Sequence, residues 1–339
     1  MMNNKTNSST PITTHNPPAT SFTHSFSQLS SITSLLGVGF AAPFKGTATE
    51  ESIAAITTPG PLIQVELSPT PSSILKEYNI WTNSTNSNLI PPHLFPQWTF
   101  PPMVAALSTL PFPMTSILNQ GCKLIMHGTL PINETMQVTA QLIEVTRETK
   151  KIKITTKITT STEKNGLACT AYVYAVIPQK KKSTPSLSST LPKPTPLLSS
   201  TLPTPIQKRQ AATVPIDSIL VAEHALQHSS GRHYAYLSGD FNPIHSLEFY
   251  AKMAGFPSMI LHGFAQMALT QEDIIKSRCG GNSLLLKEFD VRFVAPLVLP
   301  GKMLVWIDDV TSSVFVTSEE GVVTLIGTFV LGMYGNAKL

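Results

Sequence analysis

The stretch 231–269, GRHYAYLSGDFNPIHSLEFYAKMAGFPSMILHGFAQMAL, combines helix signals with a dense group of polar residues. Asn242 is a good N-cap, and Pro243 needs no amide partner in a first helical turn, so a helix is predicted from Pro243 to Ala254. Gly255 would end that helix, because glycine readily adopts the positive φ of a C-terminal cap. After the Gly-Phe-Pro turn, a longer helix is predicted over about residues 261–277.

Helix capping does not account for Asp240 and His245. His245 falls in the predicted first turn, where the positive end of the helix disfavours an imidazolium, and a nearby carboxylate would counter that effect. Asp240 lies on the preceding turn and can fold back toward His245, so the two could act as general base and general acid. Gly263 could offer its N–H to a ligand carbonyl as an oxyanion donor. This set fits proton transfer beside a carbonyl, although on the residues alone a plain capped turn fits equally well.

The remaining histidines give weaker signals. His224 and His228 have the i, i+4 spacing of a helix face and His233 follows, but nothing nearby completes a metal-ligand set, so no metal site is predicted. His127 and His262 are expected first as core or capping histidines. His262 is nevertheless included among the oxyanion and substrate-binding candidates, with Gly263 and Asn242.

The pattern found in this stretch recurs along the chain. An apolar helix is expected to open at Pro101-Pro102, and alternating β-branched segments follow at 136–146, 150–162 and 168–178. The helix over 261–277 is followed in the same way by strand patterns at 284–294, 302–310, 313–320 and 321–334. A long helix before an antiparallel sheet, present twice, predicts two copies of one α+β unit.

Composition predicts how these units are joined. Residues 1–54 form an expected disordered, low-complexity leader, since residues 1–49 hold no acidic side chain and are rich in Ser, Thr and Asn. Residues 55–178 and 213–335 are the two folded regions. The segment 179–212 between them is rich in Pro, Ser and Thr and is expected to be an extended linker, and 336–339 form a tail.

The stretch 231–269 closely resembles the signature of MaoC-like, R-specific enoyl-CoA hydratases and 3-hydroxyacyl dehydratases, and 291–307 is similar to the strand pair that follows it in that family. The resemblance implies that Asp240 and His245 are the catalytic pair, that Asn242 orients their loop, and that the Gly263 amide binds the thioester oxygen. It also implies a double hotdog, which is an α+β fold of two antiparallel sheets that each wrap a long helix. The first unit lacks the Asp-x-Asn-Pro-x-His pattern, so one active site per chain is expected.

The implied reaction is reversible hydration of trans-2-enoyl thioesters to (R)-3-hydroxyacyl thioesters. No cofactor is expected, because the CoA thioester is itself the substrate. Three alternatives stay open: a dehydratase acting on acyl-carrier-protein thioesters, a non-catalytic acyl-thioester-binding hotdog, and a thioesterase. A thioesterase usually carries its acid on the central helix, where Gln266 and Gln271 lie here, although Glu272 occurs near the end of that helix. A homodimer is one option for the assembly.

The composition and the C-terminal residues of the chain indicate which cellular location and which kinds of partner to expect. Its 339 residues are 42% hydrophobic and 13% charged with a formal net charge of +4, and no Lys/Arg stripe interleaved with aromatics indicates a nucleic-acid partner. No segment is apolar for long enough to predict a membrane span, and three scattered cysteines favour a reducing compartment. Ala337-Lys338-Leu339 is similar to the peroxisomal Ser-Lys-Leu address, so a peroxisome is expected, with the mitochondrion as the alternative.

Overall fold

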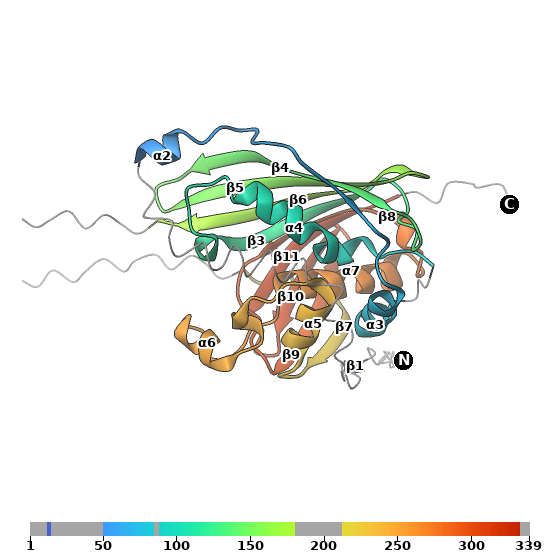
Figure 1. Ribbon diagram of the computed structural model, residues 1–339. Coiled ribbons are helices and arrows are strands. Elements are labelled where there is room, and N and C mark those ends of the chain that lie inside the picture. Colours follow the sequence, from blue (N-terminus) through green and yellow to red (C-terminus); the bar gives the residue numbers. More distant parts are fainter. Residues whose placement is uncertain (1–11, 15–49, 85–87, 180–211, 333–339) are drawn as a thin grey trace, which may run out of the picture.

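The computed structural model describes residues 12–14, 50–84, 88–179 and 212–332. Within these ranges the strands form a single eleven-stranded sheet in the order β1-β7-β9-β10-β11-β8-β3-β6-β5-β4-β2. Every pairing is antiparallel except that of β1 with β7. The sheet is therefore the element that both halves of the chain share (Figure 1).

The first half supplies five of these strands and two of the longer helices. In chain order its elements are α2 (Glu50–Ala54), β2 (Ile63–Leu67), α3 (Ser72–Thr82), α4 (Pro96–Leu107), β3 (Leu118–Met126), β4 (Met136–Arg147), β5 (Lys151–Thr162) and β6 (Gly166–Pro178). The strands form because β-branched residues alternate. In β5, for example, every second side chain from Ile152 to Thr162 is buried while the residues between face outward.

The second half supplies the central helix of the molecule. Its elements are β7 (Ile219–Leu226), α5 (Ser230–Ser238), α6 (Glu248–Met253), α7 (Gly263–Arg278), β8 (Leu286–Phe293), β9 (Gly301–Asp308), β10 (Ser313–Ser318) and β11 (Val323–Leu331), and the short strand β1 (Ile12–Thr14) pairs with β7. Helix α7 is buried on all sides from Phe264 to Ile275, as expected for a helix enclosed by a sheet.

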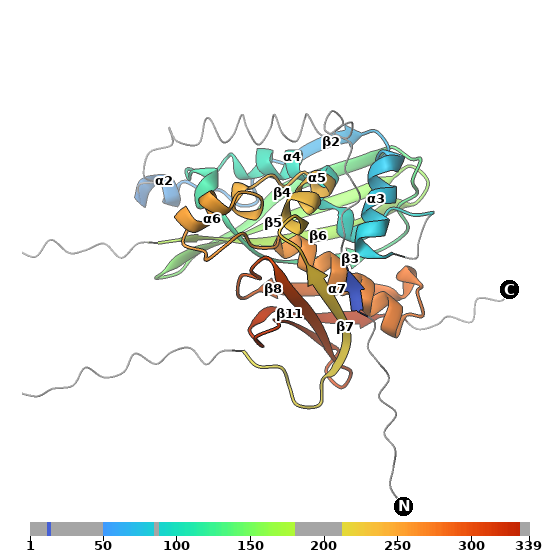
Figure 2. The same cartoon turned by 90° about the horizontal axis from the view of Figure 1, so that it is seen from below.

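The two halves repeat one topology. Strands β2-β4-β5-β6-β3 follow each other across the sheet in the same way as β7-β9-β10-β11-β8, and α4 and α7 precede β3 and β8, respectively. The halves meet where β3 pairs with β8, with Leu124 opposite Phe289. Helix α4 packs on the strands of the first half, and helices α3 and α5 contact each other (Figure 2). The predicted double hotdog is confirmed.

Two predicted helices are wrong in their bounds. The segment 243–254 is not one helix: a 3₁₀ turn, Pro243–His245, is followed by Leu247 in extended conformation and then by α6. Helix α4 begins at Pro96, five residues before the predicted start, and carries Pro101 and Pro102 in its interior. Strands β2, β3 and β7 and helices α3 and α5 were not predicted, whereas α7 begins two residues after the predicted start at about 261.

Several predictions concern residues outside the described ranges. These are most of the leader, the linker between the halves and the Ala337-Lys338-Leu339 tail. Two short elements, β1 and α2, do lie inside the segment assigned to the leader. No helix among the described residues has both the length and the apolar character needed to cross a membrane.

Candidate active site

Asp240 lies where α5 ends. Gly239 adopts a left-handed conformation with φ of 79° and its N–H donates to the Ala235 carbonyl, which closes the helix. Asn242 then caps the 3₁₀ turn, because its side chain accepts a hydrogen bond from the Ile244 amide at 3.3 Å. The predicted role of Asn242 as a cap is confirmed, and it shapes the loop between Asp240 and His245.

His245 closes that 3₁₀ turn and is buried, with 8% of its surface exposed. Its Nδ1 lies 2.8 Å from the Ile260 carbonyl oxygen. Because a carbonyl can only accept, Nδ1 carries a proton and Nε2 is the nitrogen left for proton transfer. The side chains of Asp240, His245 and His262 offer polar atoms that all lie within 4.8 Å of one another. The chain thus brings together the acid and the imidazole predicted from sequence.

His262 holds this arrangement from the other side. Its Nε2 donates to the Asp240 backbone carbonyl at 2.9 Å, and its ring stacks on His245 with centroids 3.6 Å apart and an interplanar angle of 25°. The ring of Tyr234, 5.0 Å away, packs against His262. His262 therefore contacts both members of the pair, which sequence reasoning did not foresee beyond its place beside Gly263.

Burial moves the proton affinities of the pair toward each other. It raises the pKa of the Asp240 carboxyl above its usual value, and the proximity of His245 and a hydrogen bond from the Asn242 amide only partly offset this. Burial lowers the pKa of His245, with Asp240 acting in the opposite sense. Burial and the neighbouring His245 together lower the pKa of His262 well below its usual range. Such convergence suits two groups that must exchange a proton.

Gly263 is the first residue of α7, so the positive end of a sixteen-residue helix faces this region. The first amides of a helix have no acceptor within the helix, which leaves them for a ligand. A Cβ on Gly263 would come within 2.5 Å of the Phe293 ring. Close packing against Phe293 is thus a second reason for glycine here.

Gly231 is a further requirement of the site. It lies in α5, and a Cβ there would be 2.1 Å from the His245 carbonyl oxygen. Only glycine lets α5 approach the His245 backbone this closely. Sequence reasoning missed it, because helix α5 itself was not predicted.

The other histidines do not form a site. His224 Nε2 pairs with Asp273 Oδ2 at 2.7 Å, His228 is exposed, and His233 is buried elsewhere on α5. The only group of three or more residues in the described chain with metal-ligand spacing is Asp240, His245 and His262. In that group, His262 Nε2 and His245 Nδ1 donate to backbone carbonyls, so His262 Nδ1 and His245 Nε2 are the ring nitrogens left without a carbonyl acceptor.

Known proteins share this part of the chain. Residues 204–326 match the family model described as MaoC like domain. Over 87 residues the chain is 40% identical to peroxisomal enoyl-CoA hydratase 2 of Arabidopsis thaliana, which covers 26% of this chain and 28% of that protein. Over 89 residues it is 35% identical to 3-hydroxyacyl-thioester dehydratase Y of Mycobacterium tuberculosis, covering 25% and 30%, respectively. The matched region spans less than a third of either relative.

Solved structures extend the likeness to the whole fold. The MaoC-like dehydratase of Phytophthora capsici superposes with a TM-score of 0.62 at 20% identity, over 86% of this chain and all of that one. HtdX of Mycobacterium tuberculosis superposes with a TM-score of 0.58 at 19% identity, over 80% and 100%. Both halves of the chain thus share the fold of these proteins, and Asp240, His245 and Gly263 lie within the residues that match the MaoC like domain model.

Proposed function

We propose that the protein catalyses reversible addition of water to trans-2-enoyl thioesters, which yields (R)-3-hydroxyacyl thioesters. The observation that carries this proposal is the buried Asp240–His245 pair at the N-terminal end of α7. The relatives named enoyl-CoA hydratase 2 and 3-hydroxyacyl-thioester dehydratase Y support the same class of reaction.

In the hydration direction the reactive form of the pair is the Asp240 carboxylate with the His245 imidazolium, which burial disfavours and the proximity of the two charges favours, with a water molecule held between them. Asp240 takes a proton from the water while the water oxygen bonds to C3 of the substrate. His245 Nε2 gives a proton to C2. The C2–C3 double bond becomes a single bond. The new hydroxyl on C3 comes from the water, and the new hydrogen on C2 is the proton that His245 held. Asp240 then returns a proton to His245, and dehydration follows the same path in reverse.

Negative charge forms on the thioester oxygen during the attack on C3. The Gly263 N–H and the positive end of α7 would stabilise it, since preorganised donors in a buried site are worth several kcal/mol, roughly 3–4 for one amide. Burial of His245 and His262 keeps bulk water from this region, which strengthens that interaction.

The test is a chiral product assay with trans-2-enoyl-CoA substrates of several chain lengths. We expect the R isomer of the 3-hydroxyacyl-CoA, formed by wild-type protein at a rate that depends on enzyme concentration. Exclusive formation of the S isomer, or release of free CoA by thioester hydrolysis, would contradict the assignment. Parallel reactions with acyl-carrier-protein thioesters compare the two carriers directly.

For location, we infer a peroxisome, with an acyl-CoA as substrate. Support comes from relatives named for that compartment, the Arabidopsis hydratase and the peroxisomal multifunctional enzyme type 2 of Drosophila melanogaster, which is 38% identical over 68 residues. Imaging of a protein tagged at its N-terminus, with and without residues 337–339, checks this. A mitochondrial signal would contradict it. Light scattering tests the homodimer, which would have twice the 36.7 kDa mass of the chain.

A further inference from the structure

The imidazole of His262 has one ring nitrogen in use and one unpaired. Because Nε2 donates to the Asp240 backbone carbonyl, Nδ1 is the nitrogen that carries the lone pair. Only 1% of the residue is exposed, and within the described part of the chain no group donates a hydrogen bond to Nδ1. Leaving a buried acceptor unpaired is costly, so a donor from the substrate or from water is expected to meet it.

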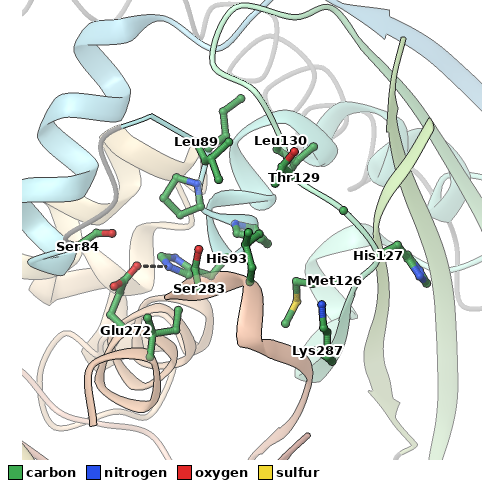
Figure 3. A pocket seen from close by; sticks show the side chains of 16 residues that line it. Ser84, Leu89, His93, Met126, His127, Thr129, Leu130, Glu272, Ser283 and Lys287 are labelled. Atoms are coloured by element: carbon green, nitrogen blue, oxygen red, sulfur yellow. Dashed lines mark hydrogen bonds and ion pairs between the residues drawn. The ribbon is translucent and has the colours of Figure 1, made fainter. Parts of the chain in front are cut away.

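His93, a buried histidine of the first half, has both of its ring nitrogens paired. Its Nδ1 lies 2.8 Å from the Tyr78 hydroxyl and its Nε2 lies 2.9 Å from Glu272 Oε1, toward which Figure 3 shows the ring directed. Burial of a histidine in this fold therefore does not by itself leave a nitrogen unpaired. His233 does have unpaired nitrogens, but it does not belong to the group around Asp240.

The internal repeat shows that the fold does not require a histidine at this position. Directly before His262, the Leu261 amide donates at 2.8 Å to the segment that follows β8, and the Ile90 amide donates at 2.7 Å to the segment that follows β3. Pro91 therefore stands in the first half where His262 stands in the second. The first half also lacks the Asp-x-Asn-Pro-x-His pattern, so the histidine occurs in the half that has the catalytic pair. This distribution favours a role in the chemistry over a role in folding.

The positions of the three side chains fit a single water molecule. Asp240, His245 and His262 each offer a polar atom, and these atoms lie within 4.8 Å of one another. One water oxygen can therefore lie at about 2.8 Å, an ordinary hydrogen-bond distance, from all three. A water that gives one hydrogen to Asp240 has a second hydrogen that needs an acceptor. Burial and the neighbouring His245 lower the pKa of His262 well below its usual range, so its ring stays neutral and keeps that lone pair.

We propose that His262 is a third catalytic residue, whose Nδ1 accepts the second hydrogen of the water that attacks C3. This role rests on the proposed function. One hydrogen of the water goes to Asp240 and the oxygen bonds to C3, while the other hydrogen stays on that oxygen and donates to Nδ1. No covalent bond of His262 forms or breaks. In dehydration the 3-hydroxyl donates to Nδ1, which turns a lone pair of its oxygen toward the proton held by Asp240.

The test compares two substitutions in the full-length protein, with kcat and KM measured on a trans-2-enoyl-CoA and folding checked by circular dichroism. In His262→Asn the amide oxygen takes the place of Nδ1 and still accepts, but nothing reaches the Asp240 carbonyl. In His262→Gln the longer amide donates to that carbonyl in place of Nε2, and the acceptor is lost. We expect kcat of His262→Gln to fall about 100-fold, the cost of a misplaced reactant, with KM unchanged because the thioester contacts remain. His262→Asn should regain about tenfold of that loss.

His228→Asn and His228→Gln, at an exposed histidine, are the matched controls and should keep wild-type kcat and KM. If His262 only supports the Asp240 backbone, His262→Gln is the faster variant. That order, or equal rates, overturns the proposal, and hydration by wild-type protein then leaves the proposed function standing. Absence of hydration in wild-type protein overturns the function and this role with it.

Two measurements on wild-type protein need no folded variant. The nitrogen-15 resonance of His262 Nδ1 should move upfield when an (R)-3-hydroxyacyl-CoA is added, because its lone pair then accepts a hydrogen bond. An unchanged resonance overturns the proposal. Hydration should also survive dialysis against EDTA, since a loss that a divalent ion restores would put an ion, and not water, among the three side chains.

Discussion

Asp240 and His245 carry the proton transfers proposed here, and each can be neutralised with little change of shape. In Asp240→Asn and His245→Gln we expect turnover to fall by roughly 10²–10⁴-fold, because that is the rate contribution of a positioned acid or base. Steady-state hydration rates and far-ultraviolet circular dichroism measure activity and folding together.

Asp217→Asn and His228→Gln are the controls, because they make the same chemical changes at exposed residues. Both should keep wild-type turnover. Near-normal rates in either Asp240→Asn or His245→Gln would remove that residue from the mechanism.

A substitution at Gly231 tests whether α5 must lie close to the His245 backbone, without changing Asp240 or His245 themselves. In Gly231→Ala the new methyl group would overlap the His245 carbonyl, so α5 or the 3₁₀ turn must shift. We expect a loss of about 1–3 kcal/mol in the free energy of unfolding, together with lower kcat. Urea denaturation and hydration assays measure the two effects.

Gly128→Ala is the matched control, since its Cβ would meet its nearest atom at 3.8 Å. It should be neutral in both assays. If Gly231→Ala behaves the same way, the close approach of α5 to His245 is not needed by the site.

Among single residues, the sequence predicted which side chains belong to the site better than it predicted the contacts between them. Asn242 and Pro243 define the turn locally, so the positions of Asp240 and His245 beside it could be foreseen. The stacking of His262 on His245 and the need for Gly231 depend on segments that meet only after folding. No local pattern contains that information.

At the scale of elements, the seam between β3 and β8 joins the two halves into one sheet. Leu124 on β3 is fully buried opposite Phe289, so Leu124→Ala should cost about 2–5 kcal/mol. Because the sheet is continuous, we expect one cooperative transition and not a separate unfolding of the first half. Fluorescence of Trp81 and Trp98 in the first half and Trp306 in the second should therefore shift to the same lower denaturant midpoint.

Single-tryptophan variants separate these signals, and Leu62→Ala, at an exposed leucine, is the control with an unchanged midpoint. A transition in which Trp306 keeps the wild-type midpoint while the first-half tryptophans move would show that the halves unfold independently.

The elements themselves were predictable where one periodicity runs undisturbed. Alternating β-branched residues gave β4, β5 and β6 nearly residue for residue. The helix predicted over 243–254 failed because Leu247 is extended, and this break leaves Asp240 and His245 on a loop rather than on a long helix. Helix α4 was placed too late because Pro101-Pro102 is a typical helix start, yet here it lies inside the helix.

At the scale of the whole molecule, α7 ties the halves together through ionisable groups. Two neighbouring residues of this helix hold histidines from different elements: Glu272 pairs with His93 of the first half, and Asp273 pairs with His224 on β7. The repeat of strand order was foreseeable from the sequence, but these two pairs, of which only Glu272–His93 joins the halves, were not, because their partners are 179 and 49 residues apart.

The dependence of stability on pH follows from the buried histidines. Burial lowers the pKa of His233, His245 and His262 in the folded chain. Below about pH 6.5, the ordinary histidine value, the unfolded chain therefore binds protons that the folded chain does not. The free energy of unfolding should then fall as pH falls, by up to about 1.4 kcal/mol per pH unit for each such histidine.

The raised pKa of Asp240 acts with the opposite sign, because the folded chain then keeps a proton that the unfolded chain has lost. A comparison of variants isolates the histidine effect from it. His262→Gln should reduce the slope of the free energy of unfolding against pH between pH 6.5 and 5.5. The expected reduction is roughly 1 kcal/mol per pH unit, because one fewer histidine takes up a proton on unfolding, and it does not depend on the absolute stability of the variant. His228→Gln, at an exposed histidine, should keep the wild-type slope. Urea titrations at several pH values and constant ionic strength measure both, and an unchanged slope in His262→Gln would mean that His262 protonates equally well in the folded protein.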